Sequence, residues 1–193
     1  MKKIGLIVIL LLITGCQGNN DETSKSVGMY NLSGDMIGTV QLSEGDNAVN
    51  LKMNLEGLEQ GFHGIQVHEY AKCDPPDFKT AGNHFNPKGL KHGLMNPDGS
   101  HVGDLPNIKA DNSGLVQDAE LAAQGATLLD GKGSLLKDGG TSIIIHKSQD
   151  DGVSQPGGNA GERVACGLIV KEKKKPDKTP TDPTEHNEDM SEG

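Results

Sequence analysis

Three histidines and one aspartate follow one another through a stretch of the chain that has no strand pattern. His84, His92, His101 and Asp104 are spaced His-x7-His-x8-His-x2-Asp. Three imidazoles and one carboxylate complete a four-coordinate zinc shell with no position left for water, which is typical of a structural zinc site. A loop without secondary structure would also gain its order from the metal. Taken alone, the same residues could be histidines scattered on a solvated loop, so their surroundings decide.

Further histidines lie in segments that resemble strands. In residues 61–70, positions 64, 66 and 68 alternate onto one face, so Gln66 and His68 lie on the same side and His63 points to the opposite one. His146 follows three isoleucines at the end of another apolar stretch. Each of these histidines, taken singly, also fits an ordinary surface position.

The elements that must position these side chains have a period of two. Residues 49–56 alternate apolar and polar side chains, which predicts a strand with one face in water. Weaker strand patterns, separated by turn sequences, occupy residues 28–33, 37–42, 64–69, 115–121, 142–147 and 164–170. About eight short strands at this spacing predict an all-β fold, an antiparallel β-sandwich or flattened barrel. Residues 73–105 and 148–163 form two long loops, which we expect to be functional.

The composition narrows the class of protein. Of the 193 residues, 33% are hydrophobic and only 3% aromatic, Trp is absent, and 27 are Gly. So many glycines favour turns over long helices, which argues against a large helical bundle. The formal net charge of −9 leaves no broad basic face to neutralise phosphates, so we expect no nucleic-acid partner.

Both ends of the chain differ from its body. Residues 1–15 combine two lysines, a short apolar stretch and small residues before Cys16, which predicts a lipoprotein signal peptide with Cys16 as the lipidated first residue of the mature chain. The alternative is a simple signal peptide with an incidental cysteine. We therefore expect an exported protein, anchored to the extracytoplasmic face of the cell membrane through a lipid on Cys16. The expected parts are a signal peptide (1–15), a polar tether (16–26), a folded domain (27–170) and a disordered charged tail (171–193).

Two cysteines remain in the expected folded domain. Export leaves Cys73 and Cys166 as an even pair in an oxidising compartment, which predicts a disulfide. It would close a loop of roughly 90 residues and stabilise the fold by about 4 kcal/mol in the chain-entropy description.

Several sequence blocks occur in an order that resembles the copper-zinc superoxide dismutase family. They are GFHGIQVHEY at 61–70, AGNHFNP at 81–87, KHG at 91–93, HVGDL at 101–105 and GNAGERVACG at 158–167. The resemblance covers residues 27–170, which is the whole expected domain. It implies a Greek-key form of the antiparallel sandwich, copper and zinc as cofactors, and superoxide as the substrate.

The resemblance also implies the metal ligands. Zinc would be held by His84, His92, His101 and Asp104, with His84 an imidazolate that bridges to copper. Copper would be held by His68, His84 and His146. At the place of the remaining copper ligand the family has a histidine, and this chain has Gln66.

Other residues match the family around the metals. Arg163 matches the catalytic arginine that attracts superoxide, and His84 would act beside it by accepting and returning a proton. Asp150 matches the carboxylate that links a copper ligand to a zinc ligand. Cys73 and Cys166 match the family disulfide.

Gln66 divides the functional expectation in two. A carboxamide oxygen is a weaker and harder ligand than imidazole for cuprous copper, so we expect weakened copper binding. The first hypothesis is a superoxide dismutase, an oxidoreductase that turns superoxide into dioxygen and hydrogen peroxide. The second is a catalytically impaired zinc-binding module of the same fold, acting as a metal buffer, copper carrier or envelope component. A homodimer is a further possible assembly of this chain.

Overall fold

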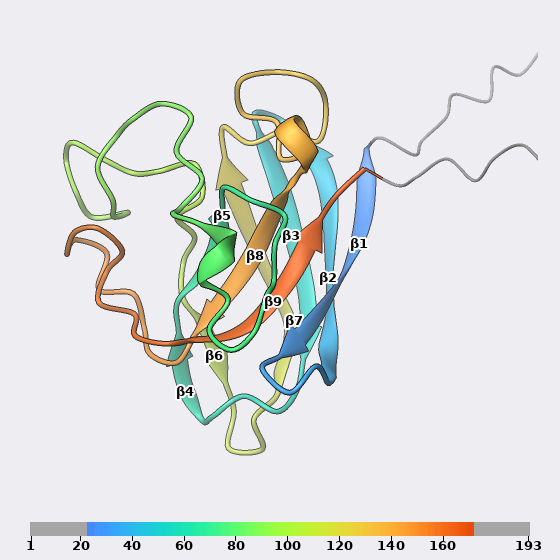
Figure 1. Ribbon diagram of the computed structural model, residues 1–193. Coiled ribbons are helices and arrows are strands. Elements are labelled where there is room, and N and C mark those ends of the chain that lie inside the picture. Colours follow the sequence, from blue (N-terminus) through green and yellow to red (C-terminus); the bar gives the residue numbers. More distant parts are fainter. Residues whose placement is uncertain (1–22, 172–193) are drawn as a thin grey trace, which may run out of the picture.

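The computed structural model describes residues 23–171, so the signal peptide, Cys16 and nearly all of the charged tail lie outside the described residues. The described part folds into short strands and two single turns of 3-10 helix (Figure 1). In chain order these are β1 (Ser24–Asn31), β2 (Met36–Gly45), β3 (Ala48–Leu55), β4 (Gly61–His63), β5 (Ile65–His68), η2 (Lys79–Ala81), β6 (Ile108–Ala110), β7 (Val116–Gln124), η3 (Lys137–Gly139), β8 (Thr141–His146) and β9 (Arg163–Ile169). β1 thus begins inside the segment expected to be a tether. No helix within residues 23–171 is long and apolar enough to cross a membrane.

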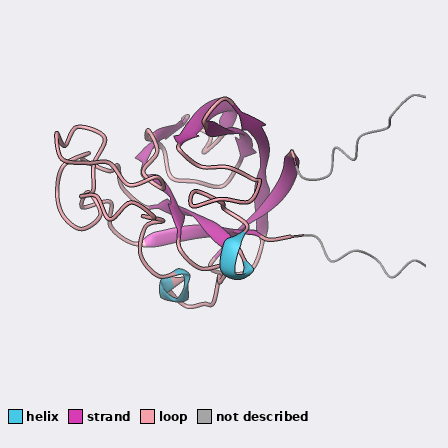
Figure 2. Ribbon diagram, turned by 90° about the horizontal axis from the view of Figure 1, so that it is seen from above, coloured by secondary structure: helices cyan, strands magenta, loops and turns pink. Residues whose placement is uncertain are grey.

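Most of the strands belong to one curled antiparallel sheet. Its order is β5-β8-β9-β1-β2-β3-β7, and the short strands β4 and β6 pair separately. Seen from above in Figure 2, the large sheet curves round on itself. The last strand, β9, returns to lie beside β1 at the start of the β1-β2-β3 meander, as in a Greek key. The predicted all-β antiparallel fold is confirmed.

The core is built from aliphatic side chains on alternate strand positions. In β3, Leu51, Met53 and Leu55 are buried, while Lys52 and Asn54 between them are exposed. The other long strands direct Val, Ile, Leu and Met side chains into the same cluster. This is the expected result for a sheet with one wet face.

The segment 61–70, predicted as one strand, is divided in two at Gly64. The Gly64 N–H donates to the carbonyl of Ser148, and the His146 N–H donates to the carbonyl of Gly64, both at 2.8 Å. A Cβ at Gly64 would lie 3.1 Å from that of Ala160, so the second long loop approaches the backbone here. These tertiary bonds replace the strand ladder, and β4 and β5 therefore belong to different sheets.

The later part of the first long loop and the second long loop lie together on one side of the sheet (Figure 1, light green and orange, at the left), while the first part, with η2, lies against β9. The start of β1 and the end of β9 lie on the other side. A further long connection, residues 125–140, was not predicted. It is fixed by the carboxylate of Glu44, which accepts hydrogen bonds from Thr127 Oγ1 and the Leu128 N–H, and by the buried side chains of Leu135 and Leu136.

Candidate metal centre

Three imidazoles of the first long loop converge on one carboxylate oxygen. The Nδ1 atoms of His84, His92 and His101 lie 2.8, 3.0 and 3.2 Å from Asp104 Oδ1. In a tetrahedral shell with bonds of about 2.0–2.1 Å, neighbouring ligand atoms are about 3.3 Å apart. The four residues predicted to bind zinc therefore already have nearly the spacing that zinc requires.

Asp104 is held as an ionised acceptor. Its Oδ2 accepts hydrogen bonds from the backbone N–H groups of Gly93 and His101, at 2.9 and 3.0 Å. Burial alone would raise the pKa of Asp104, but the contact with His84, the Gly93 N–H and the neighbouring imidazoles outweigh it and hold this pKa well below its usual range. A cation site needs this deprotonated form.

A second group of histidines lies beside the first, on β5 and β8. These strands are paired antiparallel, and His68 and His146 both lie on the buried face that carries Gln66. The Nδ1 of His68 donates to the carbonyl of Gly82, and the Nδ1 of His146 donates to that of Gly161, each at 3.0 Å. Since a carbonyl only accepts, Nδ1 carries the proton in both rings, and each Nε2 keeps a free lone pair.

The Nε2 atoms of His68 and His146 have no hydrogen-bond partner among the described residues, although both are buried. Burial, together with the charges of His84 and Arg163, lowers the pKa of His68 far below its usual value and that of His146 to about 4. Both imidazoles are therefore neutral at physiological pH and ready to bind a metal ion.

His84 belongs to both groups. The ligand atoms of His68, His84 and His146 lie within 4.8 Å of one another, and the same holds for His84, His92, His101 and Asp104. The His84 backbone forms an isolated antiparallel bridge with His68, and the two ring centroids are 5.0 Å apart. Since Nδ1 of His84 faces Asp104, Nε2 is the atom left for the second group. A Cβ at Gly157 would lie 3.2 Å from that Nε2, so a glycine keeps this approach open.

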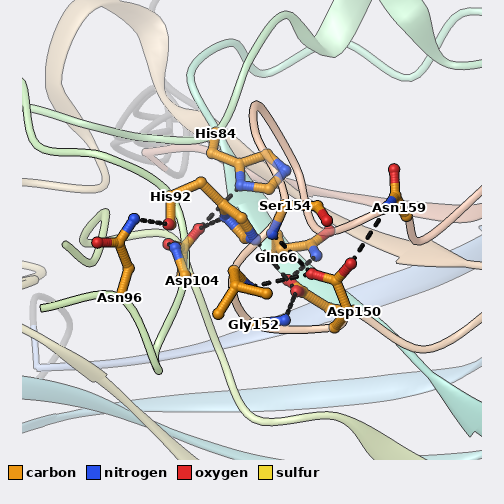
Figure 3. Close-up of polar contacts among 12 residues, drawn as sticks. Gln66, His84, His92, Asn96, Asp104, Asp150, Gly152, Ser154 and Asn159 are labelled. Atoms are coloured by element: carbon orange, nitrogen blue, oxygen red, sulfur yellow. Dashed lines mark hydrogen bonds and ion pairs between the residues drawn. The ribbon is translucent and has the colours of Figure 1, made fainter. Parts of the chain in front are cut away.

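Gln66 is fully buried, and its side chain is hydrogen-bonded to Asp150 (Figure 3). Its Nε2 donates to Asp150 Oδ2 at 2.8 Å, and its Oε1 has no hydrogen-bond partner within residues 23–171. Asp150 Oδ1 in turn lies 3.1 Å from His92 Nε2 and accepts the Gly152 N–H at 2.7 Å. Asp150 therefore connects His92 of the first group to the amide of Gln66, which stands where the resemblance places a histidine.

Arg163 lies at the start of β9, beside the disulfide. Its two terminal nitrogens donate to the carbonyls of Phe78 and Gly82 at 2.8 Å. Cys73 and Cys166 form the predicted disulfide, with their Cα atoms 5.7 Å apart. The segment between Cys73 and Gly82 is therefore fastened to β9 at two points, and this fixes the guanidinium close to His68.

Several supporting residues were not predicted from the sequence. Gln155 accepts from the His92 N–H at 3.0 Å and donates to its carbonyl at 2.9 Å, and Asn107 bonds both backbone groups of Asp150 at 2.8 Å. His63 belongs to neither group of possible metal ligands. Its ring nitrogens contact the carbonyls of His146 and Glu59 at 2.8 and 2.7 Å. Gln155 and Asn107 could not be identified from residue type or spacing. His63 could be noticed in the sequence only because it lies inside the block 61–70.

The donor sets fit two different metal ions. Three imidazoles and a carboxylate with no open position fit zinc. Imidazole groups with free, buried lone pairs fit copper or zinc, and leaving such atoms without a partner is otherwise unfavourable. The residues present therefore fit the copper and zinc implied by the sequence.

Comparison with known proteins agrees with this geometry. The family model described as copper/zinc superoxide dismutase (SODC) matches residues 36–169. "Superoxide dismutase [Cu-Zn] 2" of Aquifex aeolicus is 43% identical over 175 residues, which are 88% of this chain and 99% of that protein. A double mutant of a superoxide dismutase-like protein from Bacillus subtilis has a TM-score of 0.72 at 35% identity, over 75% of this chain and 96% of that one. Cu/Zn superoxide dismutase from Brucella abortus has a TM-score of 0.64 at 31% identity, over 76% and 99% of the two chains.

Proposed function

Because this chain belongs to the copper/zinc superoxide dismutase family, we propose that it disproportionates superoxide to dioxygen and hydrogen peroxide. The observation that carries the proposal is a pair of histidine groups that share His84. One group has the complete donor set of a structural zinc site, and the other has three imidazoles whose ligand atoms lie within 4.8 Å of one another, two of them buried without a partner among the described residues. We assign zinc to the first group and copper to the second.

The chain's own residues would bind the anion and carry the proton. Copper, when bound, would supply the one-electron oxidation of one superoxide and the one-electron reduction of another. Arg163 has five N–H groups and uses its terminal nitrogens on two carbonyls, so further N–H groups remain to hold superoxide by charge-assisted hydrogen bonds. His84 would hold the transferred proton on Nε2, since its Nδ1 faces Asp104.

Copper binding is expected to be weaker than in a site with a fourth imidazole. Gln66 offers an amide oxygen, which is a harder donor and stabilises cuprous copper poorly. This favours a second candidate function, in which the chain keeps zinc, holds copper loosely and serves as a metal buffer, copper carrier or envelope component. The substitution at Gln66 is the specific observation behind this alternative.

We further propose that the protein acts outside the cytoplasm, on the membrane. The sequence before Cys16 supports export and lipidation, and a disulfide between Cys73 and Cys166 is consistent with an oxidising compartment. Superoxide that arrives from outside the cell, or forms at the membrane, would then be the substrate.

The test compares the parent chain with Gln66→His, each loaded with zinc and copper. A fourth nitrogen on the face of His68 should raise copper affinity and dismutation rate by at least about tenfold without changing the zinc content. Equal copper affinity and equal rates in the two proteins would refute weakened copper binding. Zinc-loaded proteins that are both inactive with copper would favour the second function.

A further inference from the structure

The side-chain amide of Gln66 has one orientation that its surroundings allow. Asp150 Oδ2 accepts a hydrogen bond from Gln66 Nε2 at 2.8 Å, and an ionised carboxylate can only accept. The NH2 end must therefore face Asp150, and Oε1 must face the other way. That oxygen is buried on the same face as the unpartnered Nε2 atoms of His68 and His146, and it has no partner within residues 23–171.

Asp150 itself is held so firmly that it cannot follow the amide. Both of its backbone groups are bonded to the side chain of Asn107 at 2.8 Å, and its Oδ1 accepts the Gly152 N–H at 2.7 Å. Figure 3 shows Gln66 and Gly152 meeting Asp150 at its two carboxylate oxygens. Asp150 therefore determines which end of the Gln66 amide faces the histidines.

We propose that Gln66 is an oxygen donor to the second metal position and that Asp150 is the positioning residue that aims this oxygen. This rests on the proposed function, since it concerns the same copper site. The second position then has three nitrogens, from His68, His84 and His146, and one amide oxygen. Such a donor set suits a divalent ion of the Cu2+ or Zn2+ class.

The variant Asp150→Asn should reverse the orientation of the Gln66 side-chain amide. Asparagine has one oxygen and one NH2 group, and the fixed Gly152 N–H requires the oxygen on its side. The asparagine NH2 would then face Gln66, and two NH2 groups cannot bond each other. Gln66 would present Oε1 to Asn and its NH2 to the metal, and an amide nitrogen has no free lone pair to donate.

The experiment measures Cu2+ affinity by chelator competition on the zinc-loaded chain, together with the nitrogen hyperfine pattern of bound Cu2+. We expect three coordinated nitrogens in the parent and four in Gln66→His. Gln66→Ala and Asp150→Asn should each weaken Cu2+ binding by at least about tenfold. In the Gln66→Ala background, Asp150→Asn should weaken Cu2+ binding little further, because the Gln66 oxygen that Asp150 positions is already absent.

Asp151→Asn is the matched control, because it removes the same charge from the same loop. Asp151 bonds the N–H groups of Val153 and Ser154 and the side chain of Asn159, and it has no contact with Gln66. Its Cu2+ affinity should stay within about twofold of the parent. Zinc content is followed in every variant, since Asp150 also contacts His92.

The two proposals fail differently. If Asp150→Asn weakens Cu2+ binding equally in the Gln66 and Gln66→Ala backgrounds, or Gln66→Ala binds Cu2+ as well as the parent, Gln66 is not a ligand, and the dismutase proposal stands. If the parent binds no Cu2+ and Gln66→His alone binds it, both the oxygen-donor inference and a working copper site in this chain are refuted.

Discussion

Acid should destabilise the metal-free protein well before its carboxylates titrate. Burial lowers the pKa of His146 to about 4, whereas the same imidazole in the unfolded chain has a pKa near its ordinary value of 6.5. Between these two values the unfolded state binds the proton and the folded state does not. The stability is therefore fully present above pH 6.5 and falls as the pH drops toward 4.

The magnitude follows from the size of the shift. A pKa difference of about 2.5 units corresponds to about 3 kcal/mol at its limit, and most of it is lost by about pH 4.5. His68 changes in the same direction, because burial and the charge of His84 lower its pKa as well. Asp104 adds nothing in this window, since its pKa is lowered and its contribution is lost only at more acid pH.

Urea unfolding of the metal-free, disulfide-intact protein between about pH 7 and pH 4.5 measures the effect. In His146→Gln the side-chain amide can still donate to the Gly161 carbonyl but takes up no proton, so its loss of stability should be smaller by about 2 kcal/mol. The variant should retain some pH dependence because His68 remains. A parent whose free energy of unfolding is the same at both pH values, or a variant that loses as much as the parent, would refute the reasoning.

Asp104→Ala should weaken zinc binding by at least about tenfold in chelator competition. The sandwich should stay folded by circular dichroism, because all the proposed zinc ligands lie in one loop. Unchanged zinc affinity would contradict the zinc assignment. Reduction of the Cys73–Cys166 disulfide should raise protease sensitivity between residues 73 and 82, the segment that holds Arg163 in place. It should also lower the amount of copper that the protein retains. Retention that does not change on reduction would argue against this coupling. Cys16→Ser should move the protein from the membrane fraction to the soluble fraction, whereas an unchanged membrane fraction would rule out the lipid anchor.

The features that could be predicted from the sequence are those that depend on the type and spacing of side chains along the chain. The alternation in residues 49–56 predicted β3, and the series His84, His92, His101 and Asp104 predicted one cluster from one loop. The division of segment 61–70 at Gly64 could not be predicted, because it depends on bonds to the distant Ser148 and His146. The connection 125–140 depends in the same way on Glu44.

The backbone carbonyl groups that accept hydrogen bonds in the site also could not be predicted from the sequence. The carbonyls of Gly82 and Gly161 select the tautomers of His68 and His146, yet a carbonyl has no signature in a sequence because every residue has one. A histidine can be identified as a ligand from its place in a motif. Which of its nitrogens faces the metal is decided by the fold.

The Gly82 carbonyl connects these separate observations into one argument. It accepts from His68 Nδ1 and from Arg163, so the group that fixes a proposed copper ligand also fixes the guanidinium that would hold superoxide. Gly82 has a φ of +79°, and a Cβ there would lie 2.6 Å from the Glu69 carboxylate, so only glycine fits. Gly82 also directly precedes the Asn83–His84 segment that enters the proposed zinc site. Order in the zinc loop, the tautomer of His68 and the position of Arg163 are therefore physically coupled through a single peptide unit.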